Sequence, residues 1–176
     1  MASLREIVTT LLSKAIALAP QRDDAMARTV AWVRVMRARI PAFDGMEPGD
    51  LALIPSATLA GAAPDAAAQR ELVDYLVEQG AVGALVLGSS APSEAETSAT
   101  AGLGEAAAAN RLPCFLVTEA ESANLERTLI GAVVNRRAEL ERQAVTLERQ
   151  IAALALDGQG LDALIDRKST RLNSSH

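Results

Sequence analysis

The 176 residues predict an α/β protein, with a three-layer domain built on a mainly parallel sheet and a long following helix of coiled-coil character. Strand-like and helix-like segments alternate from residue 51 to residue 117, an order typical of parallel sheets. The segment 82–87 contains no polar residue, so both of its faces should be covered. Between residues 118 and 156, only Gly131 interrupts the helical pattern.

The N-terminal third predicts one short helix and two strands. Residues 4–12 place apolar side chains at helical spacing, and Ser3 with Glu6 forms a capping box in front of them. The segment 30–36 is rich in β-branched and aromatic residues and predicts a strand. After a turn-rich stretch, residues 51–54 predict the next strand.

The middle of the chain continues the alternation. A helix is expected over residues 66–79, with Gly80 as its stop signal, and the apolar strand 82–87 follows. A further helix reaching Asn110 leads to a strand over residues 114–117. The β-α-β-α-β order predicts right-handed crossovers between parallel strands.

The composition excludes several classes of site. A single cysteine, Cys114, cannot form an internal disulfide, and it is expected to be buried in its strand. The only histidine is His176, so neither a Cys/His zinc site nor a histidine-dependent nucleophile is expected. We therefore expect no catalytic residue, no metal, no cofactor and no enzymatic activity.

Charge and hydropathy bear on partners and location. The net charge of -5 argues against a nucleic-acid surface, so DNA contact is expected only through a C-terminal domain that this sequence does not contain. The longest strongly apolar stretch, residues 81–87, is far shorter than the roughly 20 residues that span a bilayer. We expect a cytoplasmic protein without a membrane partner.

The helical segment 118–157 is expected to connect and dimerise. A helix of about 38 residues is roughly 57 Å long, whereas the domain before it would have a radius of gyration of only about 13 Å. Its apolar residues follow the alternating three-and-four spacing of a coiled-coil seam, interrupted by Arg137. The predicted dimerisation residues are Ile130, Val133, Leu140, Ala144, Leu147, Ile151 and Leu154. The alternative is that this stripe packs on a downstream domain of its own chain.

Four parts are thus predicted: a sensory domain over residues 1–117, the helix 118–157, the start of a further domain at 158–165, and a tail at 166–176. The glycine-containing run 157–160 is expected to end the helix. The tail resembles one reading frame of a sequencing-library adapter translated into protein, so it is expected to be disordered.

The collinear order of several segments resembles a known family. Together they resemble the N-terminal, purine catabolism regulatory protein-like domain of PucR-type transcriptional regulators, and the similarity spans about residues 28 to 165. The segments that carry it are residues 30–35, 48–54, 80–88 and 111–117, followed by 134–137 and 156–161 in the long helix.

The resemblance implies a truncated bacterial regulator whose N-terminal domain senses a metabolite and whose DNA-binding helix-turn-helix lies further on. Two positions depart from the family pattern, because Arg34 stands where histidine is common and residues 55–57 replace a Thr-Thr-Gly run. The identity of the effector is therefore not carried over. The alternatives are a stand-alone small-molecule-binding or enzymatic α/β domain, and a coiled-coil assembly module with an inert head.

The candidate effector site lies at the carboxyl ends of the predicted strands, where parallel sheets gather ligands. The predicted ligand-binding residues are Ser56, Thr58, Gly88, Ser89, Ser90 and Thr118. The run from Gly102 to Ala107 also matches a dinucleotide-binding G-x-G-x-x-A pattern, but no strand leads directly into it, so no nucleotide cofactor is expected there.

Overall fold

The computed structural model describes residues 2–88, 99–117 and 125–172, and side chains as far as residue 153 except that of Arg136. The chain divides into two units, Met1–Arg136 and Arg137–His176. The first unit contains a five-stranded sheet with the strand order β1-β5-β4-β3-β2. The strands are β1 Ile16–Ala17, β2 Trp32–Val35, β3 Asp50–Pro55, β4 Gly83–Leu87 and β5 Cys114–Val117.

The sheet is mixed and mostly parallel, which confirms the predicted class. Strands β2 to β5 pair in parallel, each with its neighbour in the chain. Strand β1 pairs antiparallel with β5, with Ile16 opposite Leu116. The sequence prediction missed β1, because a strand of two residues is too short to show any periodicity.

Six helices accompany the sheet in the described part of the chain. They are α1 Leu4–Leu11, α2 Asp23–Met26, α3 Ser56–Ala62, α4 Ala66–Glu78, α6 Ala101–Asn110 and α8 Leu125–Leu172. The predicted capping box of α1 is confirmed, since the Ser3 backbone N–H donates to Glu6 Oε2 (2.9 Å) and the Glu6 N–H donates to Ser3 Oγ (3.2 Å). After α4, Gly80 takes the left-handed conformation (φ 74°) that favours glycine at a helix end.

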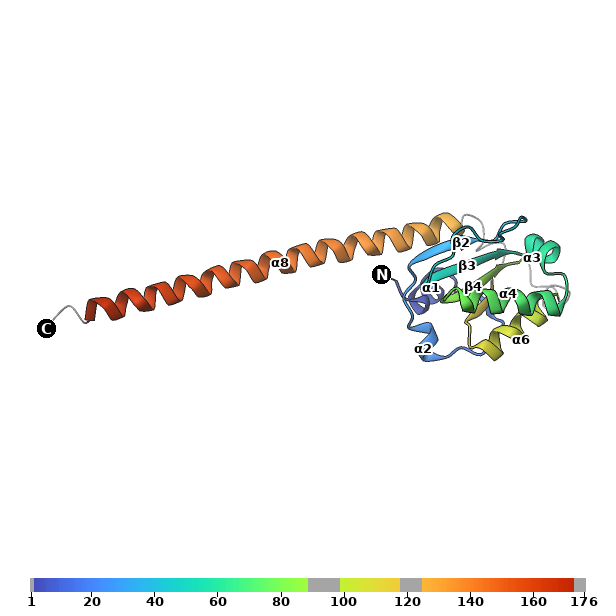
Figure 1. The fold of residues 1–176 in the computed structure, drawn as a ribbon, viewed down its shortest axis with the longest axis horizontal. Coiled ribbons are helices and arrows are strands. Elements are labelled where there is room, and N and C mark those ends of the chain that lie inside the picture. The colour runs from blue at the N-terminus through green and yellow to red at the C-terminus, as the bar shows by residue number, and fades with distance from the viewer. Residues whose placement is uncertain (1, 89–98, 118–124, 173–176) are drawn as a thin grey trace. The chain divides into compact units, whose positions relative to one another are not determined.

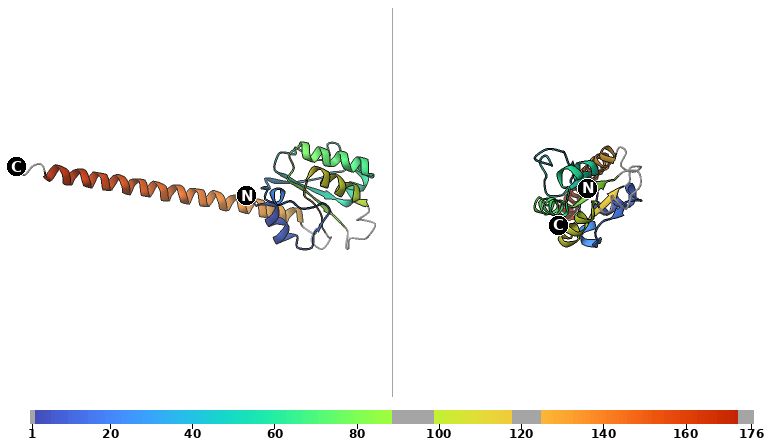
Figure 2. Two further views of the ribbon diagram at one scale, coloured as in Figure 1. Left: turned by 90° about the horizontal axis from the view of Figure 1, so that it is seen from below. Right: turned by 90° about the vertical axis from the view of Figure 1, so that its right-hand side faces the viewer.

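Two apolar cores lie on opposite faces of the sheet, because successive strand residues point to opposite sides. One core contains Ile54 and Val86 and is covered by α3, α4 and α6. The other contains Leu53 and Leu85 and is covered by α1 and the first turns of α8. Figures 1 and 2 show α4 and α6 on one side of the strands and α1 on the other. The prediction that helices cover both faces of the strand at 82–87 is confirmed.

Two glycines of α6 are packing residues. A Cβ added at Gly102 would lie 2.8 Å from Ala66 Cα, and one added at Gly104 would lie 2.7 Å from the Leu18 carbonyl oxygen. Both glycines are inside the helix, so the G-x-G-x-x-A pattern forms no strand-to-helix turn. The glycines allow the backbone of α6 to approach α4 and the segment that follows β1.

Helix α8 differs from its prediction at both ends. Leu125, Leu129 and Val133 are buried in the core of the first unit, which therefore extends to Arg136 and beyond the predicted boundary at residue 117. The backbone stays helical to Leu172, through the run 157–160 that was predicted to end the helix. A glycine inside a helix costs only about 1 kcal/mol, which does not force an end. The predicted cap at residue 118 lies outside the described residues.

Among the described residues, no helix combines the length and the apolar character that crossing a bilayer requires.

Candidate functional site

The carboxyl ends of three strands meet at one edge of the sheet. Pro55 of β3 pairs with Leu87 of β4, and Leu87 pairs with Val117 of β5. The Gly88 N–H donates to the Val117 carbonyl oxygen at 2.8 Å and extends the pairing beyond the strand. The segments that were predicted to lie together after β3 and β4 are thus neighbours.

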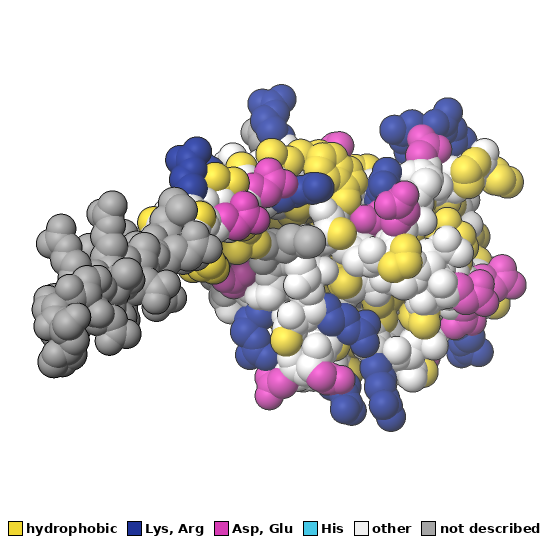
Figure 3. Space-filling view, turned by 60° about the vertical axis from the view of Figure 1, so that its left-hand side comes forward, with side chains coloured by type: hydrophobic (Ala, Val, Ile, Leu, Met, Phe, Trp, Pro, Cys, Tyr) yellow, Lys and Arg dark blue, Asp and Glu magenta, His cyan; other side chains and the backbone are white. Residues whose placement is uncertain are grey.

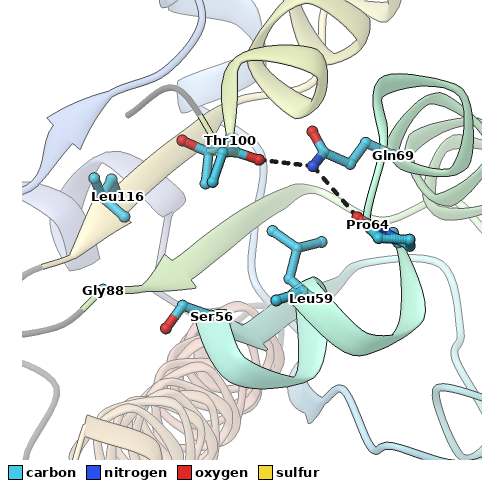
Figure 4. A pocket seen from close by; sticks show the side chains of 10 residues that line it. Ser56, Leu59, Pro64, Gln69, Gly88, Thr100 and Leu116 are labelled. Carbon is cyan, nitrogen blue, oxygen red and sulfur yellow. Dashed lines mark hydrogen bonds between the residues drawn. The ribbon is translucent and has the colours of Figure 1, made fainter. Parts of the chain in front are cut away.

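A small cavity of about 110 Å³ opens at this edge (Figure 4). Its lining is mainly apolar, with few polar groups. The lining residues are Ser56, Leu59, Ala60, Ala63, Pro64, Gln69, Gly88, Ala99, Thr100 and Leu116. Sites for drug-sized ligands usually measure about 300–1,000 Å³, so this cavity has room only for a small molecule or for part of a larger one.

Gln69 forms the wall of the cavity nearest α6. Its side-chain amide is buried and donates to the carbonyl oxygens of Ala63 (3.3 Å) and Ala99 (2.7 Å). Its Oε1 accepts the Leu103 N–H at 2.8 Å. One side chain therefore fixes the end of α3 and the beginning of α6 around the cavity.

Sequence reasoning missed Gln69, although a signal was present. Gln69, Leu72, Val73 and Leu76 recur at i, i+3, i+4 and i+7, so the glutamine lies on the buried face of α4. A polar residue on such a face requires internal hydrogen-bond partners.

The predicted effector residues differ in their positions relative to the cavity. Ser56 and Gly88 both line the cavity, from the start of α3 and from the end of β4. Thr58 is half-buried in α3 and does not line it. Ser89, Ser90 and Thr118 lie outside the described residues. The structure therefore brings together two of the six residues.

The predicted dimerisation residues also divide into groups. Val133 is 3% exposed and packs in the core of its own domain, so its prediction as a dimer contact is wrong. Ile130 is half-buried against the same core. Leu140, Ala144, Leu147 and Ile151 are exposed, and the Leu154 side chain lies outside the described set.

A buried ion pair joins β2 to β3 at the amino-terminal end of β3. Asp50 is 2% exposed, and its Oδ2 accepts from Arg34 Nε at 2.7 Å and from the Glu47 N–H at 3.0 Å. The Arg34 guanidinium also donates to the Asp44 carbonyl oxygen (3.3 Å). Arg34 thus holds the β2–β3 connection, a structural role that the sequence pattern did not indicate.

Cys114 is fully buried, as predicted, and burial raises the pKa of its thiol to about 12. The thiolate that would act as a nucleophile is therefore absent near neutral pH. In the ranges 2–88, 99–117 and 125–172, no group of three His, Cys, Asp or Glu side chains is placed to hold a metal ion.

Charged side chains on the surface view in Figure 3 lie in separate groups, with acidic residues beside many of the basic ones. No family model, no curated protein and no solved structure matches this chain.

Proposed function

We propose that this chain is the sensory and dimerising N-terminal part of a PucR-type transcriptional regulator. The α/β domain binds a small effector at the carboxyl edge of β3 and β4. Helix α8 joins that domain to a second copy of the chain. DNA is bound by a further domain, and the chain performs no catalysis.

One observation carries the proposal. The apolar stripe of α8 begins in the core of the domain with Leu125, Leu129 and Val133, and continues with residues whose side chains face solvent. A single helix thus has one end fixed to the sheet and an unpartnered apolar surface further along. This arrangement suits a module in which α8 couples effector binding in the α/β domain to association with a second copy of the chain.

The effector site is supported by the cavity at the sheet edge. Its few polar groups and apolar walls suit a small neutral molecule, and none of the described residues that line it carries a charge. Purines and their breakdown products are the first probes, although residues 55–57 depart from the family pattern and the effector of the family is not carried over.

Ligand binding is expected to depend on the cavity lining. A purine that binds the native state should stabilise the chain by about 2.7 kcal/mol at 100 times its Kd, as measured by thermal unfolding. Ser56→Val, which places a larger side chain at the lining, should abolish this stabilisation. Thr58→Val is the matched control, because Thr58 belongs to the same helix but lies outside the lining. Equal stabilisation of both variants would contradict the site.

The regulatory role has a separate test in the gene itself. The proposal requires coding sequence for a helix-turn-helix with basic residues downstream of the codon for Ile165. A native reading frame that lacks one would contradict a role in transcription.

The small cavity and the complete hydrogen bonding of Gln69 favour a second candidate, an assembly module whose α/β head is inert. That candidate predicts dimers without any purine response, whereas the sensory role predicts both.

A further inference from the structure

We infer that the exposed stripe of α8 pairs with the same stripe of a second copy in a parallel, in-register, two-stranded coiled coil. This inference rests on the dimer of the proposed function and specifies its orientation and contacts. In the part of α8 after Arg136, Leu140, Leu147 and Ile151 are 40%, 56% and 58% exposed. Apolar side chains at such spacing and exposure leave a continuous surface for a partner helix.

The residue types along the stripe favour two parallel strands. In the heptad frame, Arg137, Ala144 and Ile151 occupy a positions, and Leu140 and Leu147 occupy d positions. Ile151 is the β-branched residue among these a positions, and a β-branched residue at a with leucine at d favours two strands in a parallel coiled coil.

Charge complementarity selects a second copy as the partner. In a parallel pair, Arg136 at g faces Glu141 at e of the other chain, an attractive contact that occurs twice by symmetry. An antiparallel pair would instead place e beside e and bring Glu141 and Glu148 together. Within its own chain, Glu141 Oε1 accepts from Arg137 Nε at 3.2 Å, and both side chains are exposed. That exposed pair is weak enough to rearrange.

Arg137 marks where the apolar seam between the two copies begins. It occupies the a position that follows the buried Val133 in the heptad frame. A charged residue at an a position lowers the stability of a coiled coil and restricts its register. The apolar contact between copies therefore begins at Leu140.

The first experiment compares two exposed apolar residues of α8 in the full chain. Leu147→Asp places a charge in the seam, whereas Val145→Asp changes a residue of similar exposure (47%) at a b position outside it. Light scattering after size exclusion should show that the wild type and Val145→Asp are dimers. Leu147→Asp should raise the dissociation constant of the dimer at least about 100-fold. A monomeric wild type, or a Leu147→Asp dimer of unchanged affinity, overturns the inference.

A charge exchange tests the orientation. Arg136→Glu and Glu141→Arg should each weaken the homodimer at low salt, because each variant brings like charges together at g and e. An equimolar mixture should restore association as a heterodimer, in which both contacts are again attractive. No preference for the heterodimer would contradict the parallel arrangement.

Disulfide trapping provides the second test of orientation. Leu140→Cys and Ile151→Cys should each cross-link to an identical chain, since equal positions are adjacent in a parallel pair. The buried Cys114 makes the wild type a suitable blank. Cross-links that form only when the two variants are mixed would establish an antiparallel pair and overturn the inference. Purine binding by a monomeric chain would leave the effector site intact, so the two failures are distinguishable.

Discussion

Replacing Arg34 with methionine is expected to lower the free energy of unfolding by about 3–5 kcal/mol, because the buried Asp50 would lose its charged partner. The backbone N–H of Glu47 would remain as a donor to its Oδ2. Urea unfolding, followed by circular dichroism, would measure this change as a shift of the denaturation midpoint at an unchanged m-value.

The Arg5–Asp23 pair is the matched control for this substitution. Its N···O distance is also 2.7 Å, but the two side chains are 50% and 97% exposed. Arg5→Met is therefore expected to cost less than about 1 kcal/mol. A similar decrease in the free energy of unfolding for Arg34→Met and Arg5→Met would show that burial does not determine the strength of the Arg34–Asp50 interaction.

Gly104→Ala is expected to destabilise the domain by about 1–3 kcal/mol, although alanine is the better helix former. The added Cβ would lie 2.7 Å from the Leu18 carbonyl oxygen, a backbone atom that cannot move without shifting the chain directly after β1. Thermal unfolding of the variant and the wild type would measure the loss.

Gly131→Ala is the opposite case in the same chain. Apart from its chain neighbours and the backbone of its own helix, no atom of the described residues lies within 4 Å of a Cβ added at Gly131 in α8, so alanine should stabilise the helix by up to about 1 kcal/mol. If the two substitutions had effects of the same sign, close packing would not be the reason for glycine at position 104.

The parts of the fold that were predictable from sequence have strong local signals. Strand β4 is an unbroken apolar run, and α1 has a capping box that the structure reproduces. By contrast, β1, α2 and α3 span two, four and seven residues, too few for a helical or strand period to develop. Their conformations depend on contacts with distant segments, such as the pairing of β1 with β5.

The candidate site was predictable only where topology determined it. Ser56 and Gly88 follow neighbouring parallel strands, and this order alone placed them at one edge. Gln69 comes from a helix between those strands, and its role depends on how α4 packs against α6. Val133 was assigned to the wrong surface, because an apolar stripe does not reveal which of its turns its own domain will cover.

The ion pair of Arg34 also acts against misfolded topologies. If β2 slipped by one residue along β3, Arg34 would occupy the side now taken by Val33, inside the apolar cluster, and Asp50 would lose its cation. Alternative pairings of this short edge strand are thus penalised by the placement of a charge in hydrocarbon. The native register of β2 is therefore favoured both by its own contacts and by the free-energy cost of the alternative registers.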